Sequence, residues 1–209
     1  MTRGILPGDA QRRALRRELR DRRRAIQGAP RRRAAQRLAR RVAATGLLRP
    51  GRRIGLYLSS AEEIDTAPLV ALARARGCRI ALPRIVNQRL DRMRFHDWNG
   101  AVRRGPFNIL EPAGGHACAA RDLDVVFLPL VGFDAQGNRI GMGRGYYDRH
   151  FAHRLRHAGY RRPLLVGLAY DVQRVPALPR APHDVPLDAI VTESSILRFH
   201  GVATACTTG

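Results

Sequence analysis

The sequence contains no lysine. All 38 of its basic residues are arginines, and they outnumber the 17 acidic residues, so the formal net charge is +21. The absence of lysine excludes Schiff-base catalysis and any phosphate-binding loop that depends on a lysine side chain. A phosphate bound by this chain must therefore be neutralised by arginine, backbone N–H groups or a metal ion. Arginine suits that task because its planar fork can grip phosphate bidentately.

Cysteine and long apolar runs are also scarce. Cys78, Cys118 and Cys206 are odd in number and lack C-x-x-C spacing, which excludes a visible disulfide framework or zinc site. We therefore expect a reducing, cytoplasmic setting. No apolar run approaches the ~18 residues of a membrane span, so we expect no membrane partner. The N-terminus carries charges without the apolar core of a signal peptide.

The most informative stretch runs from Phe133 to Arg149, F-D-A-Q-G-N-R-I-G-M-G-R-G-Y-Y-D-R. An apolar run over residues 124–131 predicts a buried strand before it, and we expect a helix from Tyr146 to His157 after it. Glycine can adopt positive φ and lets a ligand approach the backbone. The start of a helix adds unpaired N–H groups and the positive end of its dipole, so the loop predicts an anion site, most naturally for phosphate. The loop glycines are Gly141, Gly143 and Gly145.

The spacing of these glycines is G-x-G-x-G, which is neither the dinucleotide-binding pattern nor the Walker pattern. A turn that binds no ligand would also explain three glycines. Arg139 and Arg144 add positive charge to the loop, and Asp148 lies where a carboxylate could hold Mg²⁺ beside a phosphate. Asp184, at a later junction between loop and strand, could join Asp148 at the metal.

Two helices are expected at the N-terminus, over residues 10–27 and 31–45, with Gly28-Ala29-Pro30 ending the first. Both are dense in arginine. A solvated helical face is one explanation; an ATP-facing arm or a nucleic-acid surface are the others. Genomic composition bias would also account for the arginine excess, and attraction of polyanions is compatible with it. No aromatic residues alternate with these arginines, which weakens the case for base stacking.

A strand–helix–strand unit follows the helical pair. We expect strands over 53–59 and 79–82, joined by a helix that begins at Thr66 and ends at Gly77, so the strands should be parallel. Ligands of such sheets bind beyond the carboxyl ends of the strands. Glu62 and Glu63 lie there and are candidates for binding amino or guanidine-like groups, although loop solvation alone would also explain them.

The remaining elements complete one α/β domain over residues 1–209. Further strands are expected over 93–98, 107–110, 163–169 and 187–192, and frayed tails over 1–9 and 201–209. Trp98 is assigned to the core, whereas Phe107 could line a pocket or seal the core. The prediction is a single domain with a mostly parallel central sheet flanked by helices and an N-terminal helical pair.

Three separated segments resemble the 5-formyltetrahydrofolate cyclo-ligase family. They are R-R-A-L-R from Arg12, L-S-S-A-E-E-I-D-T from Leu58, and the glycine loop with Tyr-Tyr-Asp-Arg; His183-Asp184 fits as well. The resemblance covers most of the chain in the same order. It implies a NagB/RpiA-like α/β fold and ATP- and Mg²⁺-dependent conversion of 5-formyltetrahydrofolate, with or without a polyglutamate tail, to 5,10-methenyltetrahydrofolate. We also expect a monomer.

The resemblance also implies roles for individual residues. Arg144 would stabilise the transferring phosphoryl group, with Tyr147 as a second catalytic residue, and Asp148 and Asp184 would hold Mg²⁺. ATP would be bound by Arg12, Arg13, Ala14, Leu15, Arg16, Arg139, Ile140, Gly141, Met142, Gly143, Arg144, Gly145, Tyr146 and Tyr147. The folate would be bound by Leu58, Glu63, Phe107, Met142, Gly143, Arg144, Gly145 and Tyr146.

The chain departs from the family pattern at two positions. Arg12 and Arg144 stand where the family often has lysine; both preserve the charge, but a guanidinium is larger and is not a compact point donor. Activity is therefore expected, and the rate is left open by these two substitutions. The alternatives are a basic nucleic-acid-binding protein, a catalytically silent folate binder, and a sugar-phosphate isomerase of the same fold group.

Overall fold

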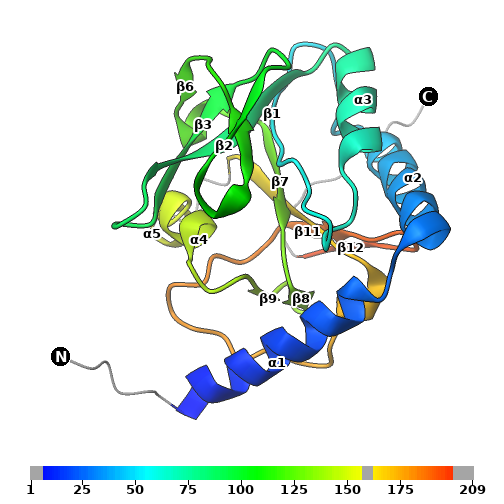
Figure 1. The fold of residues 1–209 in the computed structure, drawn as a ribbon, viewed down its shortest axis with the longest axis vertical. Helices are drawn as coiled ribbons and strands as arrows, with labels where there is room; N and C mark the ends of the chain where they lie inside the picture. The colour runs from blue at the N-terminus through cyan, green and yellow to red at the C-terminus, as the bar shows by residue number, and fades with distance from the viewer. Residues whose placement is uncertain (1–6, 157–161, 200–209) are drawn as a thin grey trace.

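The computed structural model describes residues 7–156 and 162–199 and is built on one large sheet (Figure 1). Its eight strands lie in the order β12-β11-β10-β7-β1-β2-β3-β6. The five strands from β11 to β2 are parallel to their neighbours, and β12, β3 and β6 add antiparallel edges. The expected mostly parallel sheet is therefore confirmed. The strands are β1 (Arg53–Gly55), β2 (Arg79–Asn87), β3 (Arg92–Asp97), β6 (Ala117–Cys118), β7 (Val125–Pro129), β10 (Leu164–Leu168), β11 (Ala189–Val191) and β12 (Ile196–Arg198).

Two apolar layers cover the sheet because successive residues of a strand point to opposite faces. Val125 and Phe127 of β7 belong to the buried cluster that includes residues of α2 (Gly28–Ala44) and α3 (Ala67–Ala75). Val126 and Leu128 belong to the opposite cluster, which includes Phe151. The central strands are buried on both faces, as the continuous apolar runs in the sequence predicted.

The helix α1 (Pro7–Arg24) lies apart from these layers and crosses the end of the molecule where β7 continues into a small hairpin (Figure 1). The hairpin pairs β8 (Gly132–Phe133) with β9 (Arg139–Ile140). Leu19 of α1 is fully buried against Val131 and Ile140. This contact places the arginines of α1 beside the carboxyl end of β7. No described helix is both long enough and apolar enough to cross a membrane.

The expected N-terminal helical pair is present, but its boundary was predicted incorrectly. Gly28-Ala29-Pro30 does not end the first helix: α1 ends at Arg24, and α2 begins at Gly28. Proline is tolerated in the first turn of a helix, where its missing N–H would have no intrahelical partner. The predicted frayed tail over 1–9 is wrong for residues 7–9, which are helical. Residues 1–6 and the tail from 201 lie outside the described ranges.

Two further predictions failed because tertiary pairing overrode local sequence signals. The strand expected over 79–82 continues through Pro83 to Asn87, since β2 pairs antiparallel with β3. The strand expected over 107–110 is instead a 3₁₀ turn, η1 (Pro106–Asn108), followed by β5 (Leu110–Pro112), which pairs with β4 (Val102–Arg104). Phe107 has a φ of 57°, which is incompatible with a strand. Two other 3₁₀ turns are η2 (Ala120–Asp122) and η3 (Asp171–Gln173).

The helix expected over 146–157 is divided in the structure. It forms α4 (Tyr146–His150) and α5 (His153–Arg156), and residues from 157 to 161 lie outside the described ranges. A dipole that extends over one turn is weak, so the long-helix argument for anion binding at the glycine loop does not hold. Positive charge at the loop comes from arginine side chains instead.

Candidate active site

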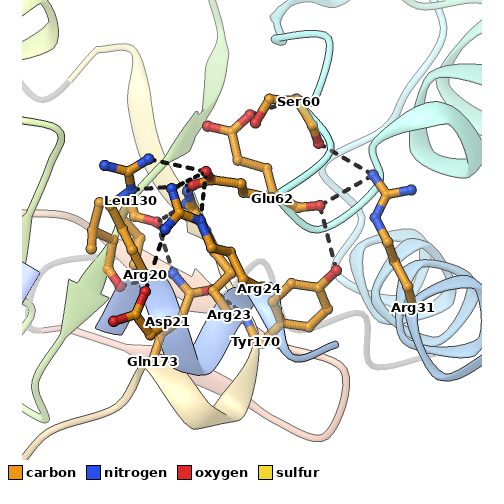
Figure 2. A network of polar contacts seen from close by, with 12 residues as sticks. Arg20, Asp21, Arg23, Arg24, Arg31, Ser60, Glu62, Leu130, Tyr170 and Gln173 are labelled. Atoms are coloured by element: carbon orange, nitrogen blue, oxygen red, sulfur yellow. Dashed lines mark hydrogen bonds and ion pairs between the residues drawn. The ribbon is translucent and has the colours of Figure 1, made fainter. Parts of the chain in front are cut away.

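Glu62 fixes three arginines of α1 to the loop after β1 (Figure 2). Arg20 Nε and Nη2 donate to Glu62 Oε2 and Oε1 at 3.1 and 3.0 Å, and Arg23 Nη2 donates to Oε2 at 3.1 Å. Arg24 Nε donates to Oε1 at 2.8 Å. The hydrogen bond from Arg20, with those from Arg24 and Arg23, lowers the pKa of Glu62 to about 2 despite its partial burial. Glu62 does bind guanidinium groups, but they belong to the chain itself.

Arg23 also joins α1 to the end of the central strand. Its side chain is only 3% exposed, and Nη1 donates to the carbonyl of Leu130 at 3.3 Å. Gln173 Nε2 donates to the same carbonyl at 2.8 Å and to that of Val131 at 3.0 Å (Figure 2). Arg23, one of the arginines that the sequence offered as a solvated face, is thus part of an interior polar network.

Glu63 has a different environment from its neighbour. Its Oε2 accepts a hydrogen bond from Ser60 N at 2.8 Å, and its backbone carbonyl accepts from Arg31 Nη2 at 3.3 Å. Burial and then the charge of Glu63 raise the pKa of Tyr147, and the same two effects raise that of Tyr57. Glu63 and Tyr147, both predicted site residues, therefore share one electrostatic environment at the carboxyl edge of the sheet.

Tyr57 is a member of this environment that the sequence analysis missed. It is 5% exposed, and its hydroxyl has no hydrogen-bond partner among the residues that the structure describes. A buried, unpaired hydroxyl is costly, which makes Tyr57 a candidate site residue. Its position one residue before Leu58, which was predicted to contact folate, was the available signal.

The glycine loop lies against α1, so two of the segments predicted to bind ATP meet. Arg16 Nε donates to the carbonyl of Gly141 at 2.8 Å. Gly143 has a φ of 98°, and its missing Cβ would lie 3.5 Å from the guanidinium carbon of Arg16. Gly145, with a φ of 65°, is the residue before α4. The expectation of positive φ in this loop is confirmed at Gly143 and Gly145.

Each of the two aspartates proposed as metal ligands accepts hydrogen bonds from an arginine. Asp184 Oδ2 and Oδ1 accept from Arg12 Nη1 and Nη2 at 2.8 and 3.3 Å. Burial alone would raise the pKa of Asp184, but the hydrogen bond from Arg12 and that from Ala181 N lower it overall. Asp148 Oδ1 accepts from Arg139 Nη2 at 2.6 Å and from Val185 N at 3.1 Å.

These pairs bring the two carboxylates to one junction, because Val185, which binds Asp148, follows Asp184 in the chain. Arg139 is 8% exposed and also donates to the carbonyl of Val185. It braces this junction from within the protein. Among the described residues, no group of three or more His, Cys, Asp and Glu side chains is arranged to hold a metal ion.

The loop arginine and the predicted pterin-facing aromatic residue are in contact. The guanidinium carbon of Arg144 lies 4.6 Å from the centroid of the Phe107 ring, a cation–π geometry. Both side chains are about half exposed, and Arg144 Nη1 also donates to Asp91 Oδ1 at 3.4 Å. Asp91 had no sequence signal that linked it to the loop. Met142 is likewise exposed at the loop.

The other predicted residues fall into two groups. Leu15 and Ile140 pack in the apolar contact beneath α1, and Leu58 packs at the margin of the main core. Arg13 and Ala14 are exposed on α1. The structure thus collects Arg12, Arg16, the glycine loop, Tyr147, Asp148 and Asp184 at one edge, with Glu63 beside Tyr147 and Phe107 beside Arg144.

Comparison with known proteins identifies the family to which this chain belongs. A family model described as the 5-formyltetrahydrofolate cyclo-ligase family matches residues 9–193. The chain belongs to the 5-formyltetrahydrofolate cyclo-ligase family. It is 30% identical over 195 residues to the 5-formyltetrahydrofolate cyclo-ligase of Mus musculus, an alignment that covers 90% of this chain and 96% of that protein. It is 33% identical over 151 residues to the protein of that name from Escherichia coli K12, covering 68% and 79%.

A solved structure supports the same cyclo-ligase assignment. The structure of Aquifex aeolicus 5,10-methenyltetrahydrofolate synthetase superposes with a TM-score of 0.78 at 26% identity, covering 92% of this chain and 94% of that one. The cyclo-ligase resemblance and the α/β fold predicted from the sequence are thus confirmed, and the chain is an enzyme of this family.

Proposed function

We propose that this cyclo-ligase uses ATP and Mg²⁺ to convert 5-formyltetrahydrofolate to 5,10-methenyltetrahydrofolate, releasing ADP and phosphate. The observation that carries the proposal is the meeting of α1 with the glycine loop through Arg16 and Gly141, beside the carboxylate of Glu63. One side of this arrangement supplies cationic groups for phosphates, and the other supplies a carboxylate for the N–H groups of a pterin.

The reaction needs activation because a formamide carbonyl is a poor electrophile and its oxygen a poor leaving group. The formyl oxygen attacks the γ-phosphorus, an O–P bond forms, and ADP leaves. N10 of the folate then attacks the activated carbon and forms the second C–N bond. Phosphate departs with the electrons of the C–O bond, N10 loses its proton, and the methenyl bridge remains. The protein mainly positions the reactants and neutralises charge.

The positions of the site residues suggest a role for each of them in this reaction. Arg12 and Arg16 lie on α1, and their guanidinium groups would contact the nucleotide. The backbone of the glycine loop can approach the phosphates closely. Arg144 is exposed at the loop and free to reach the transferring phosphoryl group once it leaves Asp91; this contact would stabilise the charge in the transition state. Burial keeps Tyr147 protonated, so its hydroxyl is a hydrogen-bond donor.

Asp148 and Asp184 would hold Mg²⁺, whose chemistry is to neutralise phosphate charge. They fit this role as hard oxygen ligands. Each already neutralises a cation, and Asp184 is kept ionised by Arg12. If Asp184 binds a metal ion, Arg12 must leave the Asp184 carboxylate and bind another anion. In this proposal that anion is a phosphate of the nucleotide.

The direct test follows absorbance of the methenyl product on mixing protein, 5-formyltetrahydrofolate, Mg²⁺ and ATP, with controls that omit ATP or Mg²⁺. A rise that requires both supports the proposal. No rise, with folate binding still measured by calorimetry, would identify a catalytically silent binder. No rise and no folate binding would contradict the assignment of substrate.

A further inference from the structure

Glu111 is a fully buried carboxylate that lies outside the site described above. It is 0% exposed and belongs to β5, where it pairs with Arg103 of β4 across the hairpin. Its Oε1 accepts a hydrogen bond from the backbone N–H of Ile85 in β2 at 2.8 Å, and its Oε2 accepts one from Arg103 Nη2 at 3.2 Å. A carboxylate is costly to bury, and these two hydrogen bonds offset that cost.

This carboxylate attaches the hairpin of β4 and β5 to the central sheet. Of residues 102–112, all of which the structure describes, Glu111 and Pro112 are buried and the others are wholly or partly exposed. A two-stranded hairpin by itself is only marginally stable in water. β1 pairs with the first three residues of β2, Arg79 to Ala81, and further along β2 the N–H of Ile85 is bound by Glu111. The hydrogen bond from Ile85 therefore anchors the hairpin to β2.

The Glu111 carboxylate also fills the inside of the turn that joins the two strands. A Cβ built on Gly105 would overlap the carboxyl group of Glu111, so the carboxylate can lie there only because residue 105 is glycine. Gly105 N donates to the carbonyl of Ile109 at 2.8 Å, and Ile109 N donates to the carbonyl of Pro106 at 3.2 Å. The turn that these hydrogen bonds close contains Phe107.

Phe107 and Asn108, at the tip of the hairpin, both have left-handed backbone conformations, with φ of 57° and 60°. Such a φ is unfavourable for a bulky aromatic residue and persists only where the surrounding structure enforces it. Arg104 Nη1 donates to Asn108 Oδ1 at 2.7 Å, which fixes one side of the tip. In this conformation the Phe107 ring lies 4.6 Å from the guanidinium carbon of Arg144 in the glycine loop. The anchored hairpin thus brings an exposed aromatic ring to the site.

We propose that Glu111 is a positioning residue for the folate substrate, because its bond to β2 holds the Phe107 ring against the glycine loop. Glu111 is buried and does not touch the substrate, so it acts through Phe107. Without the anchor the hairpin would be mobile, and folate binding would have to order it, which weakens affinity. This inference rests on the proposed function, since it assumes that Phe107 contacts the pterin.

The experiment measures kcat and the KM values for 5-formyltetrahydrofolate and ATP in Glu111→Leu, which removes both acceptor oxygens at similar volume. We expect KM for the folate to rise about tenfold, as for the loss of one hydrogen bond to a charged group, while kcat and KM for ATP change by less than about twofold. Glu111→Gln keeps an acceptor for Ile85 N and should recover most of the native KM. Arg103→Gln removes only the partly exposed ion-pair partner and is the matched control, with a KM close to that of the native chain.

A double-mutant cycle distinguishes positioning of Phe107 from a general structural role. If Glu111 acts through Phe107, Glu111→Leu should raise the KM for folate little further in a chain that already carries Phe107→Leu. Additive effects of the two substitutions, equal rises in both KM values, or an unchanged KM in Glu111→Leu would overturn the inference. Should Glu111→Leu fail to fold, Gly105→Ala displaces the same carboxylate and should raise the KM for folate in its place. A native KM for folate in Gly105→Ala would contradict the positioning role.

A second measurement separates failure of this inference from failure of the proposed function. If the native chain does not convert the folate, calorimetry compares the binding of 5-formyltetrahydrofolate to the native chain, Glu111→Leu and Glu111→Gln. Binding that is about tenfold weaker in Glu111→Leu and near native in Glu111→Gln would support the positioning role independently of the reaction. Equal binding by all three proteins, or no binding by the native chain, would overturn it.

Discussion

Arg12 Nη1 lies 2.8 Å from Asp184 Oδ2, although the two residues are 172 positions apart in the chain. This pair joins the start of α1 to the loop before β11. Arg12 Nη1 also donates to the carbonyl of Pro179 at 2.8 Å, so the guanidinium clamps that loop at two points. A residue proposed for ATP and one proposed for Mg²⁺ are thereby coupled before either ligand binds.

Asp184→Asn should therefore impair catalysis more than folding. The amide keeps hydrogen-bonding capacity but loses the charge that would hold both Arg12 and a metal ion. We expect kcat/KM for ATP to fall by more than about tenfold, since a partly buried charge-assisted pair contributes more than a neutral one. Steady-state kinetics at several Mg²⁺ concentrations, with circular dichroism for folding, would show this. Asp21→Asn, on an exposed i,i+3 pair, is the control; near-native kinetics in Asp184→Asn would remove it from the site.

Glu62→Gln should destabilise the protein, because it leaves the buried Arg23 without its carboxylate. We expect a loss of roughly 2–3 kcal/mol in the free energy of unfolding, below the full cost of breaking a buried pair because Arg23 keeps its bond to Leu130. Chemical denaturation would measure it. Glu18→Gln, in an exposed pair with Arg22, should change stability by less than about 0.5 kcal/mol. Equal effects would contradict the network in Figure 2.

The same carboxylate predicts a pH dependence. The folded pKa of Glu62 is lowered to about 2, whereas an unfolded glutamate titrates near about 4.3. Its stabilising contribution is therefore complete above the unfolded value and is lost as the pH falls toward 2. Denaturation between pH 6 and pH 2.5 should show a shallower decline in Glu62→Gln than in the native chain. Parallel curves would show that Glu62 does not contribute.

Gly143→Ala should weaken nucleotide binding through the backbone. A φ of 98° is strained for any residue with a Cβ, which costs on the order of 1 kcal/mol or moves the loop. We expect a several-fold rise in KM for ATP. Gly114→Ala, outside the glycine loop, is the control because its Cβ would meet nothing within 4 Å and its φ is not positive. Indistinguishable KM values in the two variants would argue against a phosphate contact that depends on this geometry.

Phe107→Leu should raise KM for the folate with little effect on stability. Phe107 is 48% exposed, and its cation–π contact with Arg144 contributes roughly 0.5–1 kcal/mol at such a site. Loss of the ring should also free Arg144, so KM for ATP should change less than KM for folate. Val102→Ala, another exposed apolar position, serves as control. An unchanged KM for folate would place Phe107 outside the pterin site.

The sequence alone determined the class of fold, the family and the glycine loop. Buried strands such as β7 and β10 are continuous apolar runs, and the need for positive φ in the loop follows from glycines at fixed spacing. These features are local, so the order of residues suffices to show them. Where a local signal was weak or ambiguous, as at Gly28 and Phe107, the prediction failed.

Only the tertiary structure decided which charged residues act inside the protein and which face a ligand. Glu62 and Glu63 are adjacent in sequence, yet one binds three arginines of α1 and the other lies beside two tyrosines. Arg12 and Asp184 likewise owe their environments to packing between distant segments. Electrostatic partners are set by distance in space, and with 38 arginines in the chain the sequence could not say which of them would be paired.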